Sequence, residues 1–224
     1  MIIGVSGRIF SGKDTVGKMI QDLDPKRSWQ IKKFAGKLKQ IATILTGIPV
    51  EKFEDQEFKK SALPFCWDKE IPITTLSGVD HGLRPMTVRD LLQVLGTEAL
   101  RDNLHKNVWV NALFADYVCA SEGIRYEKGE NTFTPKITPI TFNPPLCPNW
   151  IITDCRFPNE AQDITDKGGF ILKVTRPGED LTATHASETA LDNWSFDEII
   201  VNDGTLDDLK EKVRLALIKF NLYE

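Results

Sequence analysis

The segment from Gly7 to Thr15, which reads G-R-I-F-S-G-K-D-T, constrains the fold of this chain more than any other feature. It directly follows the apolar run Ile2-Ile3-Gly4-Val5, and a helical stretch from Val16 to Leu23 comes after it. A glycine-rich turn between a buried strand and a helix is typical of a phosphate-binding loop, in which backbone N–H groups and the N-terminal end of the helix face an anion. The segment therefore predicts an α/β fold with a phosphate site near its start.

The loop departs from the usual pattern at one position. Lys13 supplies a point charge for a phosphate, but Asp14 stands where a Ser or Thr hydroxyl would hold magnesium. We expect the Asp14 carboxylate to face away from the phosphates, where it caps the helix or pairs with a basic group. Thr15 is then the hydroxyl that takes the metal role. The alternative, a glycine-rich turn with an incidental lysine, is disfavoured because the sequence predicts both the strand and the helix that the motif requires.

The bulk properties exclude several classes of protein. A chain of 224 residues suits one domain with small inserted subdomains, and its net charge of -4 gives no reason to expect nucleic-acid binding. No apolar stretch approaches the roughly 20 residues of a membrane span, and we expect no signal peptide. The four cysteines form no C-x-x-C pair, so we expect reduced thiols in a cytoplasmic protein and no zinc site built from Cys66, His81 and Cys147.

Apolar runs and helical periodicities alternate along most of the chain. This order predicts a mainly parallel sheet covered by helices on both faces, a three-layer α/β/α architecture. Two proline-rich segments fall outside the alternation: 63–85 is predicted to form an extended arm or hairpin, and 123–149 a loop or loose hairpin. Further strands are expected at 29–34, 150–154, 170–175 and 199–201, and helices at 38–45, 87–99, 106–121, 160–167 and 206–220.

Asp154 and Arg156 follow a buried strand, in W-I-I-T-D-C-R-F-P-N-E. Ligands of parallel sheets gather beyond the carboxyl ends of the strands, where the phosphate loop also lies. We therefore expect Asp154 to hold magnesium and Arg156 to bind the phosphoryl group that is transferred. The alternative is an ordinary surface ion pair at a strand end.

One face of the helix predicted at 87–99 carries residues that suit a nucleotide. An arginine could bind phosphate, a glutamine could read a base edge and a glycine could permit close approach, although a solvated face would have the same spacing. A tryptophan beyond this helix could stack on a base or belong to the core, and the residues alone leave both open. These positions are Arg89, Gln93, Gly96, Thr97 and Trp109.

Two further segments border the predicted site. Arg176-Pro177-Gly178 could hinge a lid that carries Arg176 into the site, whereas for His185 we favour a structural hydrogen bond over proton transfer. A lysine cluster either borders the site or forms a solvated face, and it consists of Lys32, Lys33, Lys37 and Lys39.

Taken together, these motifs resemble the bacteriophage deoxynucleoside monophosphate kinases, within the P-loop nucleoside monophosphate kinase group. The resemblance explains the unusual Asp14, because G-K-D-T is the form found in that family. It is thinnest over 50–85 and 123–149. The matching stretches lie in family order over nearly the whole chain: G-R-I-F-S-G-K-D-T, F-A-G-K-L-K, T-V-R-D-L-L-Q-V-L-G-T-E, V-W-V, I-T-D-C-R-F-P-N-E, V-T-R-P-G, H-A-S-E and V-N-D-G-T.

The resemblance also implies a set of site residues and a division of the chain. It implies one P-loop kinase domain over 1–224, with a helical region for the nucleoside monophosphate at 35–125, the arm at 63–85 and a lid-like segment at 177–195. ATP would bind at Gly7, Ser11, Gly12, Lys13, Asp14 and Thr15, with magnesium at Thr15 and Asp154. The catalytic residues would be Lys13, Asp154, Arg156 and Arg176. The deoxynucleotide would lie among Leu38, Lys39, Arg89, Gln93, Gly96, Thr97, Trp109, Arg156 and Glu160.

The implied reaction is transfer of the ATP γ-phosphate to the 5′-phosphate of a deoxynucleoside monophosphate, which supplies precursors for phage DNA synthesis. The implied partners are small molecules, in the cytoplasm of a host cell, and the sequence leaves a homodimer open. Two other functions stay open: a P-loop kinase for another small molecule such as dephospho-coenzyme A, and a nucleotide-binding module without catalysis. The set Arg89, Gln93 and Trp109 favours a base and a phosphate over the first alternative, and the intact Lys13 argues against the second.

Overall fold

The structure, a computed structural model, describes residues 1–75, 78–127, 136–178 and 189–223. It divides into two compact units, the first formed by Met1–Lys33 with Ala112–Glu224 and the second by Phe34–Asn111. Each unit has its own cluster of buried apolar side chains. The predicted boundaries of the monophosphate region and of the lid stay predictions, and residues 179–188, which include His185, lie outside the described part of the chain.

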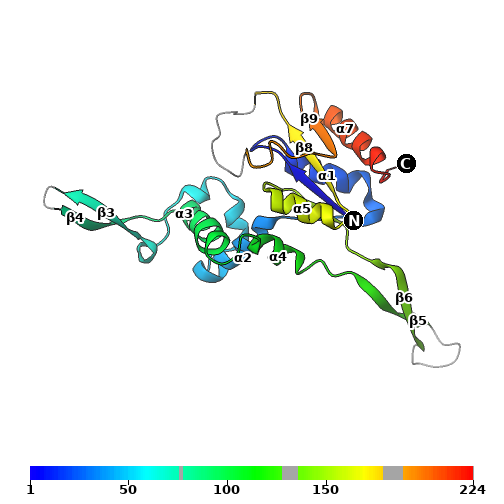
Figure 1. Cartoon of the computed structure of the whole chain (residues 1–224), viewed down its shortest axis with the longest axis horizontal. Coiled ribbons are helices and arrows are strands. Elements are labelled where there is room, and N and C mark those ends of the chain that lie inside the picture. The colour runs from blue at the N-terminus through cyan, green and yellow to red at the C-terminus, as the bar shows by residue number, and fades with distance from the viewer. Residues whose placement is uncertain (76–77, 128–135, 179–188, 224) are drawn as a thin grey trace. The chain divides into compact units, whose positions relative to one another are not determined.

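A five-stranded parallel sheet forms the centre of the first unit, with strand order β2-β7-β1-β8-β9. Figure 1 labels two of its strands, β8 and β9. The interior strands β1 and β8 have the apolar composition expected of strands that are covered on both faces. The predicted α/β fold with a parallel sheet is therefore confirmed. The bounds are β1 Ile2–Ser6, β2 Gln30–Lys32, β7 Trp150–Ile152, β8 Phe170–Thr175 and β9 Glu198–Val201.

Helices cover both faces of this sheet. On one face, Val16 of α1 and Val213 of α7 pack with Val5 of β1 in a single buried cluster. On the other face, Ile164 of α5 approaches β1 so closely that a Cβ at Gly4 would lie 2.8 Å from its Cδ1 atom. The alternation of side chains along β1 thus gives three layers. The helices are α1 Lys13–Leu23, α5 Pro158–Asp166 and α7 Leu206–Lys219, and a short 3-10 helix, η1, spans Pro25–Arg27.

The strand register brings the chemically important segments to one edge of the sheet. Because all five strands are parallel, their carboxyl ends meet there. The phosphate loop leaves β1 after Ser6, which pairs with Lys173 of β8. Ile152 of β7 pairs with Lys32 of β2, and Asp154 follows two residues later. The site predicted for phosphate therefore has its parts on adjacent strands.

The second unit is mainly helical and carries a hairpin. Its buried cluster is formed by side chains such as Ala42, Phe53 and Leu91. Strands β3 and β4 pair antiparallel, which confirms the predicted hairpin within 63–85. The elements are α2 Phe34–Thr46, η2 Val50–Glu54, η3 Phe58–Lys60, η4 Phe65–Trp67, β3 Lys69–Thr75, β4 Gly78–Arg84, α3 Val88–Gln93 and η5 Val94–Asp102, and α4 Val108–Phe114 begins in this unit.

The helix predicted at 87–99 differs from the expected regular helix. Thr87 caps it as predicted, with the side chain accepting a hydrogen bond from the Asp90 N–H. From Val94, however, the chain forms a π-helix, whose i→i+5 hydrogen bonds place more residues in each turn. The stripe predicted with a 3.6-residue period therefore does not continue, and Ala99, expected to be buried, is exposed.

The helix predicted at 106–121 is also shorter than expected, because α4 ends at Phe114. Phe114 stacks on Trp150 and Tyr117 packs edge-on against the same ring, so the chain leaves the helical path to complete this aromatic cluster. Strands β5 (Ala120–Glu127) and β6 (Lys136–Leu146) then pair antiparallel, which confirms the hairpin reading of 123–149 over its described residues.

The expectation of four reduced thiols was wrong for two of them. Cys119 and Cys147 form a disulfide, 28 residues apart in sequence. They lie next to Ala120 of β5 and Leu146 of β6, which pair with each other across the hairpin. Strand pairing therefore brings together two cysteines that lie far apart in the sequence. Cys66 is exposed and free, and Cys155 is buried and free.

The described part of the chain contains neither a membrane-spanning helix nor a cluster of three His, Cys, Asp or Glu metal ligands. No helix there is long and apolar enough to cross a membrane. Nor do any three or more His, Cys, Asp or Glu side chains in these residues come together as metal ligands.

Candidate phosphate-transfer site

The path of the phosphate loop depends on two glycines. Gly7 has a φ of 145° and Gly12 a φ of 106°, a region that residues with a side chain rarely adopt. A Cβ at Gly7 would lie 2.2 Å from the carbonyl oxygen of Val174, and one at Gly12 would lie 2.8 Å from the side-chain nitrogen of Asn202. The first glycine thus lets the loop pass close to β8, and the second lets the helix start close to the segment after β9.

Lys13 and Ser11 close the loop on itself. The Lys13 side chain is 9 % exposed, and its ammonium donates a hydrogen bond to the carbonyl oxygen of Arg8. The Ser11 N–H donates to the same oxygen at 3.2 Å. The Ser11 hydroxyl is buried and has no hydrogen-bond partner within the described structure. Buried hydroxyls are normally hydrogen-bonded, so this one calls for a partner, and a phosphate oxygen would provide it.

Asp14 pairs with a basic side chain, which is one of the two arrangements that the sequence predicted. Its carboxylate accepts a hydrogen bond of 2.7 Å from the Thr153 hydroxyl and lies 3.1 Å from the Lys33 ammonium. Burial acts to raise the pKa of Asp14, but the Thr153 hydrogen bond and the Lys33 charge outweigh it and hold the pKa below its usual value. Asp14 is therefore ionised, and its carboxylate is held by Thr153 and Lys33 beyond the ends of β7 and β2. Thr15, the next residue of α1, is half-buried.

The turn after β7 carries Asp154 and Arg156, both half-buried. The carboxylate of Glu160, which is 2 % exposed, accepts hydrogen bonds from the backbone N–H groups of Arg156 at 2.8 Å and Phe157 at 3.1 Å. Burial, together with the carboxylates of Glu160 and Asp154, raises the pKa of the Cys155 thiol well above its usual value. Glu160 was predicted to bind substrate, which stays a prediction, but its contacts show that it fixes the backbone of Arg156.

A small pocket brings Arg156 together with the phosphate loop. Its cations are Arg8, Arg156 and Lys173, and the Asp192 carboxylate lies 3.4 Å from Arg8 and 3.6 Å from Lys173. Two segments expected to share a phosphate therefore line one concave surface. The lining residues are Ser6, Gly7, Arg8, Arg156, Lys173, Leu191 and Asp192.

Sequence reasoning did not single out Arg8, Lys173 or Asp192. A signal existed for Lys173, because it is the one charged residue in the buried strand F-I-L-K-V-T. Asp192 had none, because it lies 184 residues from Arg8 in the sequence. Arg176, predicted to be catalytic, is exposed directly after β8.

In the second unit, three of the residues predicted to bind substrate lie together. A Cβ at Gly96 would lie 2.9 Å from a methyl carbon of Leu38, so η5 and α2 pack closely at this glycine. Trp109 is 5 % exposed, and its indole N–H donates to the Gly96 carbonyl at 2.8 Å. Its predicted stacking on a base stays a prediction, and the observed contact gives it a role in holding η5.

The other predicted residues of this unit are polar groups on α2, α3 and η5. Lys39 is buried and forms an ion pair of 2.5 Å with Glu54. Arg89 is exposed and donates a hydrogen bond of 3.5 Å to the side chain of Gln56. Gln93 and Thr97 are exposed as well. Their assignment to a nucleotide stays a prediction.

Known proteins with a similar sequence carry the name deoxynucleotide monophosphate kinase. The sequence profile described as deoxynucleotide monophosphate kinase matches residues 141–213, which include β7, β8 and β9. Over this part of the chain the sequence is thus similar to the deoxynucleotide monophosphate kinases. A protein of Acanthamoeba polyphaga mimivirus, provisionally named as such a kinase, is 27% identical over 221 residues, which cover 95% of this chain and 94% of that protein.

Two phage enzymes named deoxynucleotide monophosphate kinase match over a shorter span. The Enterobacteria phage T4 enzyme is 27% identical over 131 residues, and the Escherichia phage RB69 enzyme is 24% identical over 131 residues. Each alignment covers 58% of this chain and 45% of the phage enzyme. The similarity to the mimivirus protein therefore covers nearly the whole chain, whereas the similarity to the phage enzymes covers somewhat more than half of it.

Proposed function

We propose that this protein is a kinase that transfers the γ-phosphate of ATP to the 5′-phosphate of a deoxynucleoside monophosphate. The products are ADP and a deoxynucleoside diphosphate, and we place the reaction in the cytoplasm of an infected cell. Support comes from the similar proteins, which are named deoxynucleotide monophosphate kinases, and from the phosphate loop. The observation that carries most weight is that Arg156 and the loop residues Gly7 and Arg8 line one pocket.

The residues of the loop suit the phosphates of ATP. Gly7 and Gly12 adopt positive φ values, which allow successive backbone N–H groups of the loop to face an anion. The buried Ser11 hydroxyl can donate its hydrogen bond to a phosphate oxygen. The Lys13 ammonium, which donates to the Arg8 carbonyl oxygen, can donate to a phosphate oxygen in its place. We therefore assign the ATP phosphates to the loop between β1 and α1.

Thr15 and Asp154 are the side chains that would hold Mg²⁺. Magnesium prefers oxygen ligands and commonly takes one or two from the protein, the rest coming from water and phosphates. Asp14 is engaged by Thr153 and Lys33, so the Thr15 hydroxyl is the better candidate within the loop. When bound, the ion would neutralise charge on the phosphates of ATP.

Positioning and charge neutralisation account for the chemistry. The acceptor is an ionised phosphate, so the reaction needs no strong general base. Lys13, Arg156 and Arg176 supply positive charge to the group that is transferred, and Glu160 fixes the backbone that carries Arg156. We assign the monophosphate to the predicted residues of the second unit, where Trp109 would offer ring surface only, because its N–H is already bonded.

The direct test measures ADP release with a panel of deoxynucleoside and ribonucleoside monophosphates and with dephospho-coenzyme A. We expect turnover with at least one deoxynucleotide, and Lys13→Ala should lower kcat by about 10²- to 10³-fold, as loss of a preorganised donor does in other enzymes. Lys18→Ala, which removes an exposed lysine from the same helix, is the matched control and should have no effect.

Three results would contradict the proposal. Normal turnover by Lys13→Ala would remove the loop from the chemistry. Faster turnover of dephospho-coenzyme A than of every deoxynucleotide would favour a kinase for another substrate. ATP binding without turnover of any acceptor would favour a nucleotide-binding module.

A further inference from the structure

Asn202 forms hydrogen bonds with two other segments, the phosphate loop after β1 and the end of β8. It lies directly after β9, in the stretch V-N-D-G-T, to which no role was assigned. Its side-chain amide donates a hydrogen bond of 2.9 Å to the carbonyl oxygen of Ser11 in the phosphate loop. Its backbone N–H donates a hydrogen bond of 2.7 Å to the carbonyl oxygen of Thr175, the last residue of β8. One residue thus links the ends of β8 and β9 to the loop.

The contact with the loop falls on the peptide between Ser11 and Gly12. The side-chain nitrogen of Asn202 would lie 2.8 Å from a Cβ at Gly12, so the amide packs directly against this peptide. The C=O and N–H of a trans peptide point in opposite directions, because the unit is planar. With the Ser11 carbonyl held toward Asn202, the N–H of Gly12 points away from it. The hydrogen bond therefore fixes the direction of a backbone donor at the start of α1.

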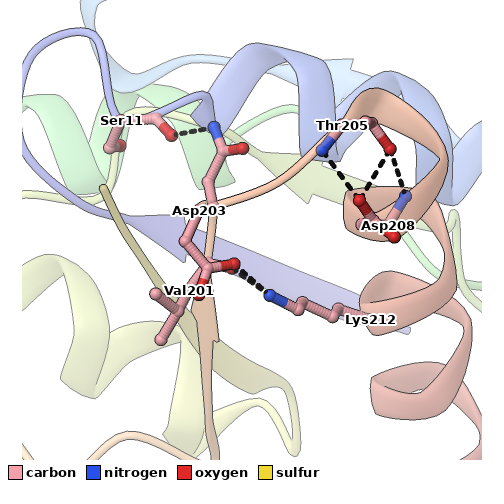
Figure 2. A network of polar contacts seen from close by, with 7 residues as sticks. Ser11, Val201, Asp203, Thr205, Asp208 and Lys212 are labelled. Carbon is pink, nitrogen blue, oxygen red and sulfur yellow. Dashed lines mark hydrogen bonds and ion pairs between the residues drawn. The ribbon is translucent and has the colours of Figure 1, made fainter. Parts of the chain in front are cut away.

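The segment that carries Asn202 is itself held in place by α7. Figure 2 shows Lys212 bonded to Asp203 and the reciprocal contacts between Thr205 and Asp208 that cap this helix. The Lys212 ammonium also donates to the carbonyl oxygen of Val201 at 2.8 Å. The backbone is thus fixed on both sides of Asn202, which holds its amide toward the loop.

We propose that Asn202 is a positioning residue for ATP, which acts by fixing the Ser11–Gly12 peptide of the phosphate loop. This proposal rests on the assignment of ATP to that loop. The chemistry requires an N–H donor, because the partner is a carbonyl oxygen that can only accept. Aspartate has nearly the same shape but would place an acceptor against this carbonyl and a negative charge beside the phosphates.

The test compares Asn202→Ala, Asn202→Asp and Asn202→Gln by calorimetric titration with a non-hydrolysable ATP analogue, and by KM and kcat. Loss of one hydrogen bond should weaken binding of the analogue by roughly 3- to 10-fold in Asn202→Ala. Asn202→Asp should weaken it further, and Asn202→Gln, which keeps the N–H donor, should recover part of the loss. The KM for the monophosphate should not change.

Thr205→Ala is the matched control, because it removes the cap of α7 in the same segment without touching the loop. It should lower Tm and leave the affinity for the ATP analogue unchanged. Equal weakening by Thr205→Ala and Asn202→Ala would reduce Asn202 to a structural residue and overturn the proposal, as would unchanged affinity in Asn202→Ala. A wild-type protein that binds the analogue but phosphorylates no deoxynucleotide would contradict the proposed function alone, because the binding comparison does not depend on turnover.

Discussion

Replacing Gly7 by alanine is expected to disrupt the phosphate loop more than any other small substitution in it. The new Cβ would lie 2.2 Å from the carbonyl oxygen of Val174, where ordinary contact begins at 3.4 Å. The strain cannot be relieved by a side-chain rotation, because Val174 belongs to β8, which is hydrogen-bonded to β1 on one side and β9 on the other. Backbone must therefore move by about 1 Å.

The cost has two parts. An alanine in the left-handed region at this φ of 145° costs about 1–2 kcal/mol, and forcing extra volume into a packed site costs about 1–3 kcal/mol more. The sum, about 2–5 kcal/mol, corresponds to a fall in Tm of roughly 4–20 °C for a chain of this size. A misplacement of 1 Å at the loop should in addition lower turnover by about 100-fold.

The measurements are thermal unfolding and the ADP-release assay. Gly36→Ala is the control, because this glycine lies in α2 with open space around its Cβ position. It should raise stability by about 0.5–1 kcal/mol, as alanine does in a helix. A Gly7→Ala protein with the Tm and turnover of the wild type would refute the reasoning about the loop.

Three further predictions concern the cysteines and Asp14. Exchanging both Cys119 and Cys147 for serine should lower the free energy of unfolding by about 3–4 kcal/mol, the chain-entropy value for a closed loop of this length. An intact mass of the wild-type protein that corresponds to four free thiols would contradict this, because it would show that the disulfide is absent. In the native protein a maleimide should label Cys66 but not Cys155, which is buried and whose pKa is raised, and labelling of both at equal rates would contradict that burial. Because the pKa of Asp14 is lowered in the folded state, its contribution to stability should be complete above the usual aspartate pKa of about 4 and disappear as pH falls through the folded value. The difference in unfolding free energy between wild type and Asp14→Asn should therefore shrink below pH 4. A difference that grows below pH 4 would contradict the lowered pKa.

Local patterns predicted most of the elements because the signals for them lie within a few residues. The run F-I-L-K-V-T predicted β8 with its bounds, and the amphipathic pattern of 206–220 predicted that α7 begins at Leu206. The glycines and the lysine of the phosphate loop lie close together in sequence for the same reason, since successive backbone N–H groups form the site for the anion. The pairing of Asp14 with Lys33 is one of the two roles that the sequence predicted for a carboxylate beside a phosphate site, the other being a helix cap.

Contacts between distant segments could not be predicted in this way. The bond from Asn202 to Ser11 joins residues 191 apart, and the disulfide joins two cysteines on opposite strands of a hairpin. The π-helix at Val94–Asp102 is a third case, in which Gly96 packs against Leu38 and its carbonyl accepts a hydrogen bond from Trp109, 13 residues away. The sequence by itself determined the order of the elements and the phosphate loop, which short-range backbone chemistry specifies. Only the tertiary structure decided which charged and polar groups surround that loop, because parallel strands bring their carboxyl ends together whatever their separation along the chain.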